Sequence, residues 1–245
     1  MNLGLEGRAA LVTGGGSGIG AAVAASLARE GCDVTIVDLE PNGPIAAIES
    51  LGRRARPVQA DVRNHACAAG VVREARESFG RLDLLVCSAG VTADAPVWKM
   101  TEAQWDDVLA VNLKGAWNYN HAVAGSFREQ RGGRIVNIAS INGLRGKFGQ
   151  ANYAASKAGM IGMSKSLARE LGKYDVNVNV VAPGLVATPM TRDLPAEVIE
   201  AATRESAIGR LCTPEACAAV IVFLCSDPAR HITGAVVHVD GGQYM

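Results

Sequence analysis

Short apolar runs alternate with longer amphipathic stretches along the chain. The apolar runs have the length and the Val, Ile and Leu content of buried strands, and they lie at residues 8–13, 33–37, 56–60, 82–87, 133–139 and 176–182. The stretches with helical spacing lie between them at residues 21–30, 43–51, 63–79 and 101–127, and a further helix follows residue 150. No internal repeat and no low-complexity linker interrupts this alternation. We therefore expect residues 1–245 to form a single α/β domain with a doubly wound parallel sheet of about seven strands and helices on both faces.

The composition agrees with a core of aliphatic side chains. Hydrophobic residues make up 49% of the chain and aromatic residues only 4%, which is typical of parallel strands covered by helices. The 24 basic residues balance the 24 acidic residues, so charge gives no reason to expect nucleic acid or an anionic membrane as a partner. Because no signal peptide and no long apolar segment is visible, we expect a cytoplasmic protein.

The cysteines and histidines give no metal or nucleophile pattern. The six cysteines, at positions 32, 67, 87, 212, 217 and 225, form no CxxC pair and have no histidine cluster beside them. They are predicted to be small core residues in a reducing compartment, and no metal is expected. The four histidines show no spacing suited to a metal site or a nucleophilic triad.

A glycine-rich loop follows the first apolar run and precedes a helix. The residues suited to phosphate binding there are Gly14, Ser17, Gly18, Ile19 and Gly20. Glycines permit tight turning and close approach of the backbone, and free amides at the start of a helix attract a pyrophosphate. The alternative is a plain strand-to-helix turn, but the strand before and the helix after favour dinucleotide binding.

Asp38 stands at the end of the second predicted strand. A carboxylate at this place can accept hydrogen bonds from both hydroxyls of an adenosine ribose and repels a 2′-phosphate. Residues 15–17 contain no Arg or Lys that would neutralise such a phosphate. The pattern predicts NAD as the cofactor and disfavours NADP. The alternative is that Asp38 caps a helix or turn before Pro41.

Other small or polar residues end the remaining strands, and they should share one edge of a parallel sheet. They are Asp61, Val62, Ser88, Ala89, Gly90, Ser140, Pro183 and Gly184. Ligands of doubly wound sheets bind beyond the carboxyl ends of the strands. Asp61 has an equal alternative as the N-cap of the helix that begins near Asn64.

Tyr153 and Lys157 are four residues apart on a predicted helix, so they share a face. A lysine charge close to a phenol lowers the pKa of the phenol, which suits Tyr153 to proton transfer near neutrality. Ser140 could hold a carbonyl or alkoxide oxygen against the Tyr153 proton. Asn112 lies within a helical stretch that does not favour it, so it either satisfies a local backbone gap or interrupts the helix to orient a water. The alternative for Tyr153 and Lys157 is an ordinary amphipathic helix face.

Several ordered motifs resemble the short-chain dehydrogenase/reductase family over the whole chain. They are Thr13-Gly14-x-x-x-Gly18-x-Gly20, Val-Asn112-Leu-Lys-Gly, Ser140, Tyr153-x-x-x-Lys157, Pro183-Gly184 and the tail from Ile232 to Gly242. The resemblance implies a Rossmann-type fold in which Tyr153 is the general acid or base and Ser140 positions the substrate oxygen. It also implies that Lys157 lowers the Tyr153 pKa and binds the nicotinamide ribose, and that the Asn112 backbone holds a water. Tyr153, Lys157, Val186 and Thr188 would also contact the cofactor.

The chain departs from the family after the fourth predicted strand. Many relatives have Asn-Asn-Ala-Gly there, whereas this chain has Cys87-Ser88-Ala89-Gly90. Bonds that two amide side chains would make must then come from Ser88 or from water, which bears on cofactor affinity but not on proton transfer.

The C-terminal third resembles 3-oxoacyl-acyl-carrier-protein reductases and related 3-hydroxyacyl-CoA or secondary-alcohol dehydrogenases. Those reductases usually take NADPH, which conflicts with Asp38. We therefore expect an NAD-linked enzyme that interconverts a secondary alcohol and a ketone and works in the oxidative, catabolic direction. Its substrate would be a 3-hydroxyacyl thioester, on CoA or on a carrier protein, or else a small cyclic or aryl alcohol. The alternatives are an NADPH-dependent 3-oxoacyl-acyl-carrier-protein reductase and a non-catalytic dinucleotide sensor. The resemblance also implies a homotetramer.

Substrate choice is expected to lie in residues 144–148 and 185–207, since the second stretch is long enough to form a mobile lid. Arg145 and Lys147 could meet a phosphate or carboxylate of a carrier-bound substrate. Equally, they could be solvated loop charges.

Overall fold

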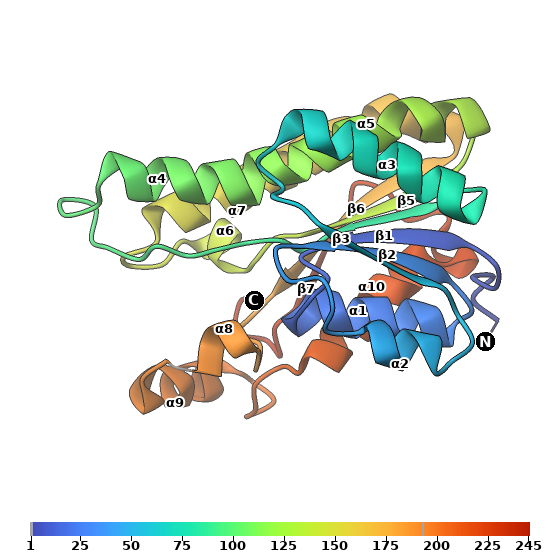
Figure 1. Cartoon of the computed structure of the whole chain (residues 1–245). Coiled ribbons are helices and arrows are strands. Elements are labelled where there is room, and N and C mark those ends of the chain that lie inside the picture. Colours follow the sequence, from blue (N-terminus) through green and yellow to red (C-terminus); the bar gives the residue numbers. More distant parts are fainter. Residues whose placement is uncertain (1, 193) are drawn as a thin grey trace.

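The computed structural model describes residues 2–192 and 194–245, and one parallel sheet of seven strands runs through this part of the chain (Figure 1). The strand order is β3-β2-β1-β4-β5-β6-β7, and every pairing is parallel. The strands are β1 (Ala9–Thr13), β2 (Asp33–Asp38), β3 (Ala55–Gln59), β4 (Leu84–Cys87), β5 (Gly133–Ile138), β6 (Val176–Pro183) and β7 (Val236–Val239). The predicted fold class is confirmed, because the order reverses at β1 as in a doubly wound sheet.

Helices cover both faces of the sheet (Figure 1). One face carries α1 (Gly18–Arg29), α2 (Ile45–Glu49) and α10 (Pro214–Cys225). The other carries α3 (His65–Phe79), α4 (Glu102–Leu109), α5 (Gly115–Gln130) and α7 (Ala151–Leu171). The remaining helical segments are η1 (Ala110–Lys114), α6 (Asn142–Arg145), η2 (Gly172–Tyr174), α8 (Pro189–Arg192), α9 (Ala196–Glu205) and η3 (Asp227–Ala229). Within the described residues, no helix has the length and hydropathy needed to cross a membrane.

Local sequence signals account for several of the helix starts. The Asn64 side chain accepts the Cys67 amide and caps α3. Thr101 and Gln104 form a reciprocal capping box at α4, which satisfies two amides that would otherwise lack partners. Thr213 caps α10 directly before a proline in the first turn, a position where a missing N–H has no cost.

The core has two layers, one on each face of the sheet. Side chains of α3, α5 and α7 pack against one face, where Tyr119 and Phe127 are the largest fully buried groups. Side chains of α1 and α10 pack against the other. The five inner strands are buried along almost their entire length, whereas β3 and β7 are partly exposed at the edges. Burial on both faces explains why the inner strands read as continuous apolar runs in the sequence.

Three segments differ from the sequence-based prediction. The single helix expected over residues 101–127 is divided into α4, the π turn η1 and α5. Residues 142–145 form the short helix α6 where a loop was expected. The expected lid region contains α8 and α9, which project beyond the sheet at the carboxyl ends of the strands (Figure 1).

Candidate active site

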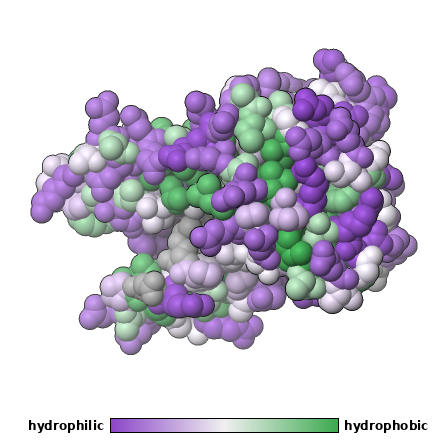
Figure 2. All heavy atoms as spheres, viewed as in Figure 1, coloured by the Kyte–Doolittle hydropathy of each residue, from purple (hydrophilic) through white to green (hydrophobic). Residues whose placement is uncertain are grey.

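A cavity of about 830 Å³ lies at the carboxyl ends of the strands. Figure 2 shows the surface hollowed between the arm that contains α4 and α7 and the arm that contains α8 and α9. All sequence-predicted site residues line this cavity except Gly20 and Asn112. Those that do are Gly14, Ser17, Gly18, Ile19, Asp38, Asp61, Val62, Ser88, Ala89, Gly90, Ser140, Tyr153, Lys157, Pro183, Gly184, Val186 and Thr188.

The glycine loop forms one end of the cavity. Gly14 and Gly18 have positive φ angles of 65° and 53°, a conformation that other residues rarely adopt. A Cβ on Gly14 would also lie 2.5 Å from the Ala89 amide, so only glycine fits between β1 and β4. Gly20 lies behind the loop, where an added Cβ would meet the Gly14 carbonyl. Its part is therefore to pack helix against strand.

The start of α1 fits an anionic ligand. Ser17 is the N-cap residue, yet its side chain makes no capping hydrogen bond. The first-turn amides of this twelve-residue helix therefore have no side-chain partner from the cap, and they adjoin the cavity that Ser17, Gly18 and Ile19 line. Amides and dipole together favour a pyrophosphate.

Asp38 closes the same end of the cavity. One carboxylate oxygen accepts the Gly16 amide at 2.9 Å, and the other accepts the Glu40 amide at 3.2 Å. The carboxylate therefore both caps the turn before Pro41 and stands on the cavity wall, so the two interpretations of this residue are compatible.

Asp61 also lines the cavity, but it does not cap a helix. Asn64 caps α3, so the N-cap alternative for Asp61 is wrong. The Asp61 carboxylate instead accepts the Arg63 guanidinium at 2.6 Å, and this hydrogen bonding lowers the pKa of Asp61. Arg63 also pairs with Asp107 at 2.7 Å, which links the end of β3 to α4.

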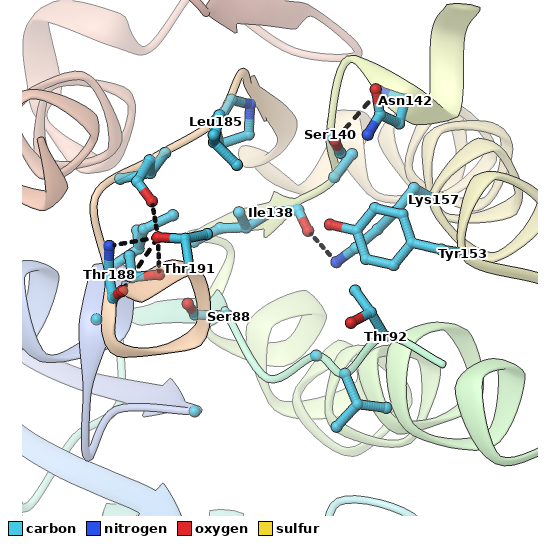
Figure 3. A pocket seen from close by; sticks show the side chains of 18 of the residues that line it. Ser88, Thr92, Ile138, Ser140, Asn142, Tyr153, Lys157, Leu185, Thr188 and Thr191 are labelled. Atoms are coloured by element: carbon cyan, nitrogen blue, oxygen red, sulfur yellow. Dashed lines mark hydrogen bonds between the residues drawn. The ribbon is translucent and has the colours of Figure 1, made fainter. Parts of the chain in front are cut away.

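The opposite end of the cavity carries Ser140, Tyr153 and Lys157, whose side chains converge on one wall (Figure 3). Ser140 follows β5, whereas Tyr153 and Lys157 project from one face of α7. Lys157 is buried, and its Nζ donates to the Ile138 carbonyl at 2.8 Å and lies 5.6 Å from the centre of the Tyr153 ring. Burial lowers the pKa of Lys157 to about 8.

The structure corrects the expected direction of the Tyr153 pKa shift. Burial raises the pKa of Tyr153, the Ser140 hydroxyl opposes this shift, and the Asp94 carboxylate adds to it. The pKa of the phenol is raised overall, although the Lys157 ammonium lies 5.6 Å from the centre of its ring. Desolvation of the phenol is therefore stronger than the helix spacing alone suggested.

A chain of hydrogen bonds that sequence reasoning missed supports Ser140. The Ser140 hydroxyl accepts the Asn142 amide at 3.1 Å, and the Asn142 side chain donates to Gln150 at 3.0 Å. Gln150 is buried and donates in turn to Asp94 at 2.8 Å. The only signal was a polar Gln directly before the helix that carries Tyr153. These bonds restrict Ser140 from the loop side of the cavity.

Asn112 lies outside the cavity, in the π turn η1. Its side chain accepts the Val91 amide at 2.8 Å and donates to the Val91 carbonyl at 3.0 Å and to Ser156 at 3.1 Å. It therefore satisfies a local backbone gap and also marks the point where the helix is interrupted. π turns of this kind are frequent at functional sites. That its backbone holds a water remains a prediction.

We call residues 184–192 and 194–212 the strap, because several of them line the cavity. Within it, the Thr191 hydroxyl accepts the Thr188 amide at 2.9 Å and donates to the Val186 carbonyl at 2.7 Å (Figure 3). Arg145 on α6 pairs with Glu205 at the end of α9 at 3.0 Å. Arg145 is thus not merely a solvated loop charge, whereas Lys147 is exposed at the cavity wall.

The departure at Cys87 leaves an apolar strand end. Cys87 is buried, and its sulfur receives a long hydrogen bond from Asn120 at 3.5 Å. Ser88 lines the cavity, and its backbone amide donates to the Thr13 carbonyl at 3.0 Å.

The described residues contain no group of His, Cys, Asp and Glu side chains suited to a metal ion. The cavity thus brings the hydroxyl groups of Ser140 and Tyr153 and the ammonium group of Lys157 together with the glycine loop.

Comparison with known proteins agrees with this geometry. Residues 14–243 match the family model described as enoyl-(acyl carrier protein) reductase. The chain is 42% identical over 241 residues to the 3-oxoacyl-[acyl-carrier-protein] reductase of Thermotoga maritima, covering 97% of this chain and 98% of the relative. It is 41% identical over 240 residues to the Escherichia coli enzyme of the same name, with 98% of both chains covered. It is also 40% identical over 245 residues to the acetoacetyl-CoA reductase of an Acinetobacter strain, covering 98% of this chain and 99% of the relative.

Proposed function

Because the chain belongs to the short-chain dehydrogenase/reductase family and is an oxidoreductase acting on CH–OH groups, we propose that it interconverts 3-oxoacyl and 3-hydroxyacyl thioesters. The observation that carries this proposal is one continuous cavity with the glycine loop and Asp38 at one end and Ser140, Tyr153 and Lys157 at the other. Reduction of the 3-oxo group is the favoured direction, since the relatives named above are reductases. This revises the oxidative, catabolic role expected from the sequence.

A pyridine nucleotide, the cofactor that the family implies, supplies or accepts the hydride when bound. The amides of Gly18 and Ile19 at the start of α1 would hold its pyrophosphate, and Ser88 and Ala89 would lie along its path. Lys157 would hold its nicotinamide-side ribose, and Thr188 its carboxamide. These roles fit the uncapped first turn of α1 and the close packing at Gly14.

Proton transfer falls to Tyr153 in this proposal. A phenol with a raised pKa is protonated at neutral pH, so Tyr153 carries the proton that a general acid donates to the oxygen of a carbonyl as the alcohol forms. Ser140, fixed by Asn142, donates a hydrogen bond to the same oxygen. Lys157, with a pKa of about 8, keeps a positive charge near the phenol at neutral pH and stabilises the phenolate as it forms.

We propose NAD(H) rather than NADP(H) as the preferred nucleotide. Asp38 accepts the Gly16 and Glu40 amides at the place where the adenosine ribose would lie, and its charge would repel a 2′-phosphate. The loop from Gly14 to Gly20 contains no basic side chain to offset this charge.

The thioester part of the proposal rests on the mouth of the cavity and on the relatives. Leu194, Val198 and Ala201 of the strap line the cavity and would accept an acyl chain. Arg145 and Lys147 lie at the same mouth, near where a phosphate on a carrier arm would emerge. A small cyclic or aryl alcohol would contact the apolar residues but would have no negative group to pair with Arg145 or Lys147.

The substrate test compares the rate of reduction of acetoacetyl-CoA with the rate of reduction of a cyclic ketone of similar size. Each rate is measured from the loss of NADH absorbance. We expect a higher kcat/KM for the thioester by an order of magnitude or more. Equal values, or a preference for the cyclic ketone, would reject the thioester while leaving the reaction class intact.

The cofactor test compares NADH with NADPH in the same assay, for the unaltered protein and for Asp38→Asn. The substitution retains the side-chain shape and removes the charge. We expect a preference for NADH that falls by about tenfold or more in the variant, about 1.4 kcal/mol. An unaltered protein that prefers NADPH would contradict the assignment of Asp38.

The remaining sequence-based expectations stay predictions of this account. They are a single domain over residues 1–245, a homotetramer and a cytoplasmic location. Sedimentation at concentrations used for the assay would test the oligomeric state.

A further inference from the structure

Two cysteine side chains lie in contact where the strap ends and α10 begins. The sulfur atoms of Cys212 and Cys217 are 3.4 Å apart. Cys212 is half-buried, whereas Cys217 is fully buried in the core layer beside α1 and α10. A spacing of five residues is not a recognised dithiol motif, so their pairing could not be predicted from the spacing. The contact arises because the extended chain at Cys212 turns into the first turns of α10.

The surroundings of the two thiols differ. Hydrogen bonds from the Cys217 side chain and backbone lower the pKa of Cys212 to about 7, and burial opposes this shift. The interaction with Cys212 and burial raise the pKa of Cys217. Cys212 is thus the more nucleophilic and more accessible sulfur, and Cys217 is a protonated thiol held against it.

None of the other four cysteines combines a partly exposed thiol with a second cysteine sulfur in contact. Cys32, Cys87 and Cys225 are buried, and burial raises the pKa of each to about 12. Cys67 is half-buried on α3. Among the described residues, no second pair of cysteine sulfurs is in contact.

We propose that Cys212 and Cys217 form a peroxide-reactive dithiol that is converted into an intramolecular disulfide. The Cys212 thiolate attacks one oxygen of a hydroperoxide and breaks the O–O bond, which gives a Cys212 sulfenic acid and hydroxide or an alkoxide. The released anion takes up the proton that the Cys212 thiol had lost to solvent and becomes water or an alcohol. The Cys217 thiol then attacks the Cys212 sulfur, and its proton leaves with the displaced hydroxyl as water. Two thiols lose two electrons in total, and the hydroperoxide gains them.

The two sulfurs lie close to each other before the disulfide forms, and the disulfide would act on the strap. The sulfurs need to move from 3.4 Å to the bonding distance of about 2.05 Å. The Cys212 carbonyl accepts the Ala187 amide at 3.0 Å, and residue 212 pairs with Val186 in an isolated bridge. The disulfide would therefore anchor the trailing end of the strap to α10. The site is separate from the proton-transfer residues and does not depend on the proposed function.

The test treats the full chain with a small excess of hydrogen peroxide, removes the peroxide, unfolds the protein in guanidinium chloride, blocks the remaining thiols with N-ethylmaleimide and measures the intact mass. We expect four of the six cysteines to take the label after oxidation and all six after subsequent reduction with dithiothreitol. Trypsin should release residues 211–230, which contain Cys212, Cys217 and Cys225, so fragmentation of this peptide locates the bond. Six labelled thiols after oxidation, or a bond that includes Cys225 or Cys67, would overturn the proposal.

Variants assign the two roles. Cys225→Ala should retain the disulfide, and Cys212→Ser should lose it. Cys217→Ala should leave a sulfenic acid on Cys212 that a cyclic 1,3-dione traps, whereas Cys212→Ser should give no adduct. A dione adduct on another cysteine in Cys217→Ala would contradict the assignment of Cys212 as the reacting thiol. If the thermal transition shows that Cys217→Ala does not fold, Cys217→Ser replaces it. Fragmentation of the peptide from the unaltered protein shows independently whether the bond joins Cys212 and Cys217.

Discussion

The wall that carries Ser140, Tyr153 and Lys157 and the strap opposite are built differently. The wall consists of β5, which is buried throughout, and α7, a helix of 21 residues that packs into the core. The strap contains the short helix α8 and the helix α9, which has no buried residue. The bridge between Val186 and Cys212 joins the two ends of the strap, while the ion pair of Glu205 with Arg145 and a hydrogen bond from the Gln243 side chain to the Ala202 carbonyl at 2.8 Å hold α9.

This difference separates two tasks. A proton-transfer group needs a fixed position and a water-poor environment, which a buried strand and a long helix supply. A region that admits and releases substrates needs to open, which few buried contacts and surface ion pairs permit. We therefore expect substitutions on the wall to act on kcat and substitutions on the strap to act on KM.

Apart from loss of the Tyr153 hydroxyl itself, the largest expected effect comes from Lys157→Met, which removes the charge from the wall and keeps the apolar stem. We expect kcat to fall by about two to three orders of magnitude, because the phenolate loses its stabilising charge. Lys165→Met is the matched control, since Lys165 is exposed on the same helix. If Lys157→Met retained a tenth of the turnover, the wall would not depend on this charge.

Ser140→Ala is expected to lower kcat by about a hundredfold with a smaller change in KM, because one hydrogen bond to the reacting oxygen is lost. Ser166→Ala, exposed on α7, provides the control. A change in KM alone would instead place Ser140 in substrate binding. Steady-state kinetics with the preferred thioester separate the two outcomes.

Lys157 should also leave a signature in stability. Its pKa in the folded protein is about 8, below the ordinary value of 10.5. Between pH 8 and pH 10.5 the unfolded chain therefore keeps the Lys157 proton, whereas the folded protein has lost it. The free energy of unfolding should rise with pH from about 8 to 10.5, and the cost of the buried charge at neutral pH is about 3 kcal/mol. Urea unfolding at pH 7 and pH 10, compared with Lys157→Met, isolates this contribution. A difference that does not depend on pH would mean that the ammonium is not destabilised by burial.

The smallest effect is expected on the strap. Glu205→Gln removes the ion pair with Arg145, and surface ion pairs contribute at most about 1 kcal/mol, so the thioester KM should rise by two- to fivefold. kcat should change less than KM. Glu200→Gln, which loses only the exposed pair with Arg204, serves as the control. A tenfold fall in kcat for Glu205→Gln would erase the distinction between the wall and the strap.

The elements of the sheet could be predicted because their signals are local. The apolar runs and the glycines of the loop report on strands and a tight turn without reference to distant residues, and all six predicted strands are found within a few residues of their expected bounds. The shared edge followed from the rule for parallel strands, which brought Asp38 and Ser140 into one cavity.

The parts that could not be predicted depend on contacts between residues far apart in the chain. The Gln150 bond to Asp94 and the Arg145 pair with Glu205 join segments whose approach no local pattern specifies. The raised pKa of Tyr153 reflects burial by several elements, whereas the helix spacing revealed only its nearest charge. The π turn at Asn112 was visible only as an unfavourable helix residue.

The central claim is that the Tyr153 phenol donates the proton in a cavity that also holds the nucleotide. The direct test is Tyr153→Phe, with NADH binding followed by fluorescence and turnover followed with acetoacetyl-CoA. We expect NADH affinity within about threefold of the unaltered protein and turnover lower by at least about a thousandfold, since the proton donor alone is removed. Turnover within tenfold of the unaltered value, with NADH bound normally, would contradict the account.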